Sequence, residues 1–240
     1  LLEQCAAGMA TQVIVNGPST REAAILAGIG RRNPPVLIGG GSGNGVDVDR
    51  YAPSQHASRE ATRTELGLPA QAIVIGFIGR LTRDKGISDL LDVFEKLAIG
   101  RSDLHLLLVG DVEPGDPVGA DVVQRIESRS DITRLAWVPD TSVLYPGLDL
   151  LMFPSAREGL PNVPLQAESA SVPVVGYAAT GTVDAVSDGV TGILVEPGDV
   201  TGLGEAVRSL VDDADRREAL GAAGPGWVRE RFEQNTFWAT

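Results

Sequence analysis

Two almost uninterrupted apolar runs, Ile73–Gly79 and Leu104–Val109, constrain the fold of this chain more than any other feature. A strand that is covered on both faces is apolar throughout, so these runs predict buried parallel strands. Further short runs predict strands, with helical patterns between them, at Ile132–Val138, Leu150–Phe153, Pro173–Tyr177 and Ile193–Val195. Alternating strands and helices predict an α/β fold with a doubly wound, Rossmann-like parallel sheet.

The N-terminal part is organised differently. Val13–Val15 and Val36–Ile38 predict two short strands, and Ser19-Thr20-Arg21-Glu22 between them has the pattern of a capping box that opens a helix. The glycine-rich stretch Gly39–Gly45 predicts a flexible linker. We therefore separate residues 1–45, which include this linker, from the main domain that follows.

Charge and cysteine content narrow the function. The 240-residue chain has a formal net charge of −12, which argues against nucleic-acid binding and against a broad face for anionic membranes. The single cysteine, Cys5, excludes an intramolecular disulfide and fits a reducing cytoplasm. No apolar run approaches the roughly 20 residues of a membrane span.

The loop after the first buried run carries Arg80 and Lys85 between Gly79 and Gly86. The glycines let the backbone approach a ligand. Cations at the carboxyl edge of a parallel sheet would stabilise the charge that develops on a diphosphate leaving group. The alternative interpretation is a solvated loop with ordinary surface charges.

A second candidate site follows the apolar run Leu150–Pro154. In the stretch Arg157–Ala167, Glu158 and Gly159 stand where a strand passes into a helix. The first turn of that helix leaves N–H groups free for an anion or a sugar hydroxyl. The alternative is a glutamate favoured only by the helix dipole.

These two stretches resemble the donor site of the retaining GT-B glycosyltransferases. The 79–86 loop is similar to the family's G-R-x-x-x-x-K-G diphosphate signature, and the 158–167 stretch matches most of its E-G-x-P-x-x-x-x-E-A motif. The resemblance implies that Arg80 and Lys85 hold the diphosphate and that Glu158 holds the donor sugar, so these three are the candidate catalytic residues. The donor-binding set that it implies is Gly79, Arg80, Lys85, Trp137, Val138, Glu158, Gly159, Leu160, Pro161, Asn162 and Gln166.

Gln166 departs from the family motif, which has a second glutamate at this position, and Glu168 lies two residues further on. In the family the second acid accepts hydrogen bonds from both ribose hydroxyls. An amide has only one acceptor oxygen, so we expect nucleotide binding to be weaker by about 1–2 kcal/mol.

The resemblance implies neither a cofactor nor a metal. Asp47-Val48-Asp49 has the form of the D-x-D metal motif of the other main transferase fold, but a bare tripeptide is weak evidence.

The resemblance covers nearly the whole chain. Residues 46–226 are similar to the donor-binding half of the family, residues 1–45 to the tail of the acceptor-binding half plus the linker, and residues 227–240 to a shortened helix that crosses back. We expect the N-terminal segment to pack on the main domain or on a neighbouring copy. With most of the acceptor half missing, we expect donor binding without sugar transfer.

For the full-length protein, the resemblance implies transfer of a hexose or N-acetylhexosamine from a nucleotide sugar, UDP before GDP, to a polysaccharide or lipid-linked glycan with retention. The acceptor is expected to bind the missing N-terminal domain, and peripheral membrane association is compatible with such a substrate. Two alternatives stay open, namely a sugar-nucleotide epimerase of the same two-lobed fold and a non-catalytic nucleotide-sugar-binding module.

Overall fold

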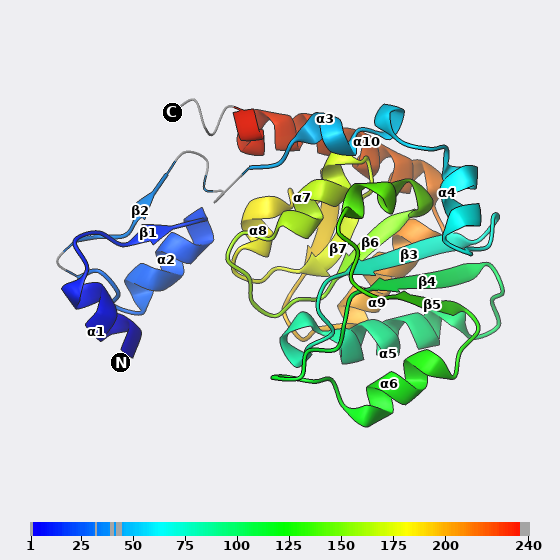
Figure 1. Ribbon diagram of the computed structural model, residues 1–240, viewed down its shortest axis with the longest axis horizontal. Helices are drawn as coiled ribbons and strands as arrows, with labels where there is room; N and C mark the ends of the chain where they lie inside the picture. Colours follow the sequence, from blue (N-terminus) through cyan, green and yellow to red (C-terminus); the bar gives the residue numbers. More distant parts are fainter. Residues whose placement is uncertain (1, 32, 39–40, 42–44, 236–240) are drawn as a thin grey trace.

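The protein is described by a computed structural model that covers residues 2–31, 33–38, 41 and 45–235. Its main body is built on a six-stranded, all-parallel sheet (Figure 1). In order across the sheet the strands are β5 (Ile132–Leu135), β4 (Leu104–Val109), β3 (Ile73–Ile78), β6 (Leu150–Phe153), β7 (Val174–Tyr177) and β8 (Gly192–Val195). The prediction of a doubly wound, Rossmann-like sheet is confirmed.

The strand order places a switch point between β3 and β6. From β3 the chain builds one half of the sheet through β4 to β5, and then returns to the middle at β6 to build the other half. Ligands of such sheets bind beyond the carboxyl ends of the strands at the switch point. Both motifs singled out in the sequence directly follow these two strands.

Helices cover both faces of the sheet, which explains the apolar runs. In β3, Ile75 and Phe77 face one apolar cluster, whereas Val74 and Ile78 face the other. The first cluster includes α5 (Ile87–Ala98), α6 (Ala120–Glu127) and α9 (Val200–Val211). The second includes α3 (Val48–Tyr51), α7 (Asn162–Ser169) and the end of α10 (Ala214–Phe232), and Figure 1 shows α5 and α6 opposite α3 and α10.

A buried ion pair joins α4 (Arg59–Glu65) to the sheet at the amino end of β6. Arg63 Nη2 donates to Asp149 Oδ2 at 2.6 Å, and both side chains are almost fully buried. Val74 N donates to the same oxygen at 2.7 Å. The other Arg63 donors reach the carbonyl oxygens of Gly147, Pro69, Ala70 and Ala72. Burial lowers the pKa of Arg63, but these acceptors satisfy the guanidinium.

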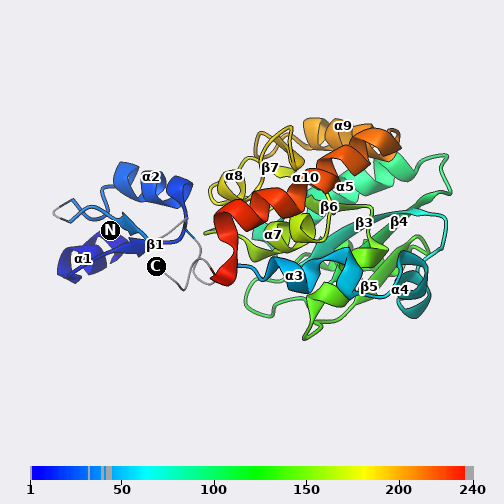
Figure 2. The same ribbon diagram turned by 90° about the horizontal axis from the view of Figure 1, so that it is seen from above.

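The N-terminal unit lies to one side of the main body (Figures 1 and 2). It contains α1 (Leu2–Met9), α2 (Pro18–Leu26) and a parallel pair of short strands, β1 (Ile14–Val15) and β2 (Val36–Leu37). The predicted capping box is wrong, because α2 begins at Pro18 with Gly17 at the N-cap and has no side-chain cap of its own. Packing on the main domain is confirmed, since the start of α2 contacts α8 (Thr182–Ala185).

The residue that directly follows the linker, Val46, pairs with the end of α10 and the residues after it. Residues 39–40 and 42–44 of the predicted linker, and residues 236–240, lie outside the described residues. After the linker, Val46 N donates to Phe232 O, and Gln234 N donates to Val46 O. Trp227 lies inside α10 rather than at the start of an element, and its indole Nε1 donates to Ala185 O at 3.0 Å.

In the parts of the chain that the structure describes, no helix is both long enough and apolar enough to cross a lipid bilayer.

Candidate functional site

The two predicted loops meet at the switch point. Lys85, which follows β3, donates from Nζ to Oε1 of Glu158, which follows β6, at 2.5 Å. Each side chain is about 15% exposed, so the pair is mostly buried but retains some access to solvent. Ser155 Oγ donates to the same Oε1 at 2.7 Å. Two residues predicted from separate motifs are therefore in direct contact.

Backbone contacts hold the two loops together. Ala156 N donates to Asp84 O at 2.9 Å. Gly86 has a φ of +69°, and a Cβ there would collide with Pro154 O, so both the conformation and the close approach require glycine. A hydrogen bond from Thr82 Oγ1 holds the pKa of the Asp84 carboxyl below its usual value, with Lys85 nearby acting in the same direction.

The turn from Glu158 to Asn162 leads directly into α7. The helix begins at Asn162 with Pro161 at the N-cap, and no side chain caps its first turn. Leu160 is almost fully buried in the core and Pro161 is buried beside it, so these two anchor the turn, while Asn162 is exposed. Leu160 can therefore contact a ligand only through its backbone, because its side chain is buried.

A cavity of about 490 Å³ lies at the carboxyl ends of β3 and β4. Four predicted site residues, Gly79, Arg80, Trp137 and Val138, line it. Trp137 is 70% exposed and lies beyond β5, which ends at Leu135 and not at the predicted Val138. The remaining lining comes from Ile78, the 109–114 segment and Thr141.

Arg80 and Lys85 differ in their surroundings. Arg80 is 62% exposed and forms an ion pair with Glu113, another residue that lines the cavity. Lys85 is mostly buried and contacts Glu158. An ammonium group has three N–H donors, so Lys85 can keep its bond to Glu158 and still donate to a ligand.

Gln166 lies at the margin of the same cavity. Its Oε1 accepts from Tyr145 OH at 2.9 Å and from Thr141 Oγ1 at 3.2 Å, and Thr141 lines the cavity. Tyr145 is fully buried, and burial raises the pKa of its phenol, so the hydroxyl stays protonated at neutral pH. Thr141, Tyr145 and Ser155 were not predicted as site residues, and no local sequence pattern distinguishes them.

Glu168 takes no part in this arrangement. Its side chain is fully buried, Oε1 accepts from Thr191 Oγ1, and Oε2 has no hydrogen-bond partner among the described residues. Burial raises the pKa of Glu168 to about 8, so the carboxyl is predominantly neutral at pH 7. Glu168 therefore does not replace the glutamate that the motif has at position 166.

Glu168→Gln should become increasingly stabilising, relative to the parent, as the pH rises. The folded-state pKa of about 8 exceeds the ordinary value of 4.5, so the parent loses stability between pH 4.5 and 8. The neutral amide does not titrate, and the difference in the free energy of unfolding should grow by up to about 1.4 kcal/mol per pH unit. Urea denaturation at pH 5, 6, 7 and 8 measures it. A constant difference across this range would contradict the buried neutral acid.

Both aspartates of the D-x-D tripeptide have partners within the protein. Asp47 caps α3 by accepting from Arg50 N, and Asp49 forms an ion pair with Arg229 at 2.6 Å. Within the described residues, no group of three or more histidine, cysteine, aspartate or glutamate side chains is placed to hold a metal ion.

The fold and these contacts define a Rossmann-like domain with cations, an acid and a cavity gathered at its switch point. The sequence identifies the family. Residues 72–213 match the family described as Glycosyl transferases group 1, and the chain belongs to this family.

Relatives of known name support the assignment. The chain is 28% identical over 238 residues to the capsular polysaccharide biosynthesis glycosyltransferase CapM of Staphylococcus aureus, covering 99% of this chain and 62% of CapM. It is 33% identical over 189 residues to a D-inositol 3-phosphate glycosyltransferase of Corynebacterium kroppenstedtii, covering 74% of this chain and 41% of that protein. The chain thus spans less than two thirds of the length of these relatives.

A similar solved structure is that of Anabaena Alr3699/HepE in complex with UDP and glucose. The TM-score is 0.83 at 28% sequence identity, and the match covers 98% of this chain and 63% of HepE. The predicted resemblance to the GT-B glycosyltransferases is confirmed in both family and fold.

Proposed function

We propose that this chain binds the nucleotide-sugar donor of a retaining, metal-independent glycosyltransferase, and that the donor is a UDP-sugar. The observation that carries the proposal is the contact between Lys85 and Glu158 at the switch point. Similarity to HepE, which was crystallised with UDP and glucose, supports the choice of UDP.

Each group has a role that follows from its surroundings. Lys85 and Arg80 donate to the diphosphate and stabilise the charge that grows on it as the sugar departs. Glu158 accepts hydrogen bonds from sugar hydroxyls, and it also orients Lys85. The cavity beside Trp137 and Val138 accommodates the base, and Gln166 faces the ribose.

For the whole protein we propose transfer of a hexose or N-acetylhexosamine to a polysaccharide or lipid-linked glycan, which similarity to CapM supports. The proposed division is residues 46–226 for donor binding, residues 1–45 for the end of the acceptor-binding half with the linker, and residues 227–240 for the crossing segment. The described contacts of Lys85, Glu158 and Gln166 all suit a donor, so we assign acceptor binding to the remainder of the longer protein.

A titration calorimetry series tests the proposal. UDP and UDP-glucose should bind the chain at a single site, and inorganic phosphate should compete only weakly because it fills neither the cavity nor the sugar site. Failure of both nucleotides to bind at millimolar concentration would refute it.

Gln166→Glu should tighten UDP binding by about 1–2 kcal/mol, because hydrogen bonds to a charged acceptor are stronger than those to a neutral one. Tyr145 and Thr141 already donate to the oxygen of residue 166, and a carboxylate would keep these bonds while offering its second oxygen to the ribose. The 2′,3′-dideoxy analogue of UDP, which lacks both ribose hydroxyls, should gain less.

Gln124→Glu, on the exposed side of α6, adds the same charge far from the site and provides the control. If Gln166→Glu tightens both nucleotides equally, residue 166 does not contact the ribose.

A further inference from the structure

The start of α2 lies against the turn that carries Glu158. Thr20 Oγ1 donates to Gly159 O at 3.1 Å across a separation of 139 residues in the sequence. The side-chain amide of Asn16 lies directly over Gly159, because a Cβ at Gly159 would collide with Asn16 Nδ2. Figures 1 and 2 show the N-terminal unit on the side of the main body where α8 lies.

Ser19 and Asp184 hold this contact together. Asp184 Oδ2 accepts from Ser19 N at 3.0 Å and from Ser19 Oγ at 2.6 Å, and Oδ1 accepts from Ser19 N at 3.2 Å. Ser19 Oγ in turn accepts from Gly181 N at 2.8 Å. Asp184 therefore caps α2 from another element, and its negative charge is favourable at a helix N-terminus.

Gly181 connects this cap to the turn that carries Glu158. Its φ is +81°, and a Cβ there would collide with Gly159 O. The residue before Gly181, Thr180, accepts a hydrogen bond through its carbonyl oxygen from Glu158 N at 3.1 Å. Ser19 is thus linked through Gly181 to the backbone of Glu158 and Gly159.

Asn16 is the polar group that this arrangement places at the turn. It is half-buried, and its side-chain amide forms no hydrogen bond to any residue that the structure describes. An amide offers two donors and an acceptor oxygen, which matches the hydroxyl groups of a sugar. Glu158, the acid assigned to those hydroxyls, is adjacent in sequence to Gly159.

We propose that residues 16–20 form a second wall of the donor-sugar site, in which Asn16 hydrogen-bonds a hydroxyl of the sugar and Ser19 and Asp184 are positioning residues. This inference rests on the proposed function, because it assumes that a nucleotide sugar binds beside Glu158. It assigns to the N-terminal unit a part in donor recognition that no motif in that unit indicates.

The test compares UDP-glucose and UDP-N-acetylglucosamine with UDP, which lacks the sugar. Asn16→Ala should weaken binding of at least one nucleotide sugar about three- to tenfold, the range for one neutral hydrogen bond, and change UDP binding less than twofold. Ser19→Ala and Asp184→Ala should reproduce this selective loss. Ser19→Thr keeps the hydroxyl, so it should preserve the parent's ratios, by which we mean the dissociation constant of each nucleotide sugar divided by that of UDP.

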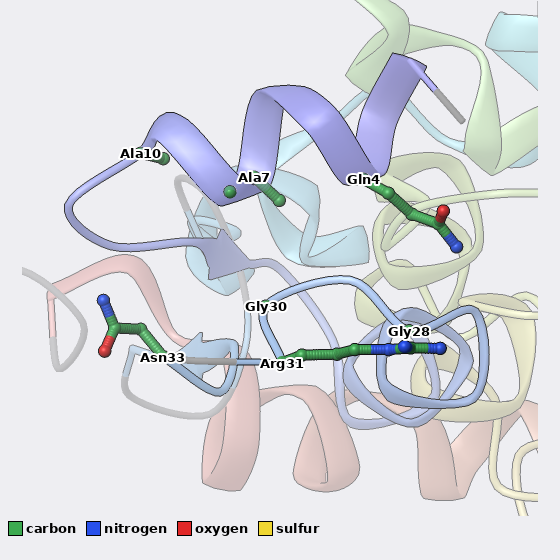
Figure 3. A pocket seen from close by; sticks show the side chains of 8 residues that line it. Gln4, Ala7, Ala10, Gly28, Gly30, Arg31 and Asn33 are labelled. Atoms are coloured by element: carbon green, nitrogen blue, oxygen red, sulfur yellow. The ribbon is translucent and has the colours of Figure 1, made fainter.

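Asn33→Ala is the matched control within the N-terminal unit. Asn33 donates to Thr11 O at 3.2 Å and lines a separate cavity of about 480 Å³ between α1 and the loop after α2 (Figure 3). This variant should keep the ratios of the parent. If it loses the nucleotide sugars as Asn16→Ala does, general loosening of the unit explains the effect and the inference fails.

Two results separate this inference from the proposed function. Unchanged ratios in Asn16→Ala for both nucleotide sugars, or equal losses for UDP and the sugars, would overturn the inference, whereas a parent that binds no UDP would overturn the proposed function. The cap is also tested without ligand. Amide exchange at Gly181 should be several-fold faster in Ser19→Ala, and unchanged exchange would contradict the role of Ser19.

Discussion

Replacing Arg63 by alanine should lower the free energy of unfolding by about 3–5 kcal/mol, the cost of breaking a buried ion pair by removing one partner. Asp149 would stay buried without its principal partner, and the carbonyl oxygens that now accept from Arg63 would lose their donors. Urea denaturation at pH 7 measures the loss.

Arg59→Ala is the matched control. Arg59 also contacts Asp149, at 2.6 Å, but its side chain is 51% exposed. Asp149 keeps its bonds to Arg63 and Val74 N when the half-exposed Arg59 is removed, so this variant should cost only about 1 kcal/mol. Because Arg63 and Asp149 share one network, the double variant Arg63→Ala/Asp149→Ala should cost less than the sum of the single variants. Equal effects of Arg63→Ala and Arg59→Ala would contradict the structural role of Arg63.

Lys85→Ala should weaken UDP binding by about 1.5–3 kcal/mol, the range for hydrogen bonds to charged groups. The mostly buried position of Lys85 limits screening by salt, and Glu158 holds its ammonium at the switch point. Arg80→Ala should fall at the lower end of this range, because Arg80 is largely exposed and pairs with Glu113.

Lys96→Ala provides the control for Lys85, since Lys96 is the one other lysine of the sequence and lies exposed in the last turn of α5. It removes the same charge far from the switch point and should leave calorimetric titrations with UDP unchanged. Were Lys85→Ala to bind UDP as the parent does, the assignment of the 79–86 loop to the diphosphate would be wrong.

The central strands were predictable because burial on both faces forces an apolar residue at every position. This holds for Leu104–Val109, where every residue except His105 is apolar and all are buried. Lys85 and Glu158 each follow a predicted strand at the carboxyl edge, and the resemblance to the GT-B family assigned them to one donor site. Their direct contact depends on the pairing of β3 with β6, which the sequence alone does not specify.

Contacts between distant segments escaped prediction for the same reason. The pattern at Ser19 is typical of a local cap, yet its partner, Asp184, lies 165 residues away. The sequence around Arg63 is polar and does not indicate that its side chain is buried. The groups that accept its hydrogen bonds, Asp149 and Gly147 O, come from another part of the chain. Local patterns specify which element a residue occupies, whereas these roles depend on which elements become neighbours.

A crystal structure of the chain with UDP-glucose tests the central claim most directly, namely that the Lys85–Glu158 contact marks the donor site. The account predicts the diphosphate within hydrogen-bond distance of Lys85 Nζ, sugar hydroxyls at Glu158, and the uracil in the cavity beside Trp137 and Val138. A nucleotide bound elsewhere, for example in the cavity lined by Arg31 and Asn33 of the N-terminal unit, would contradict it.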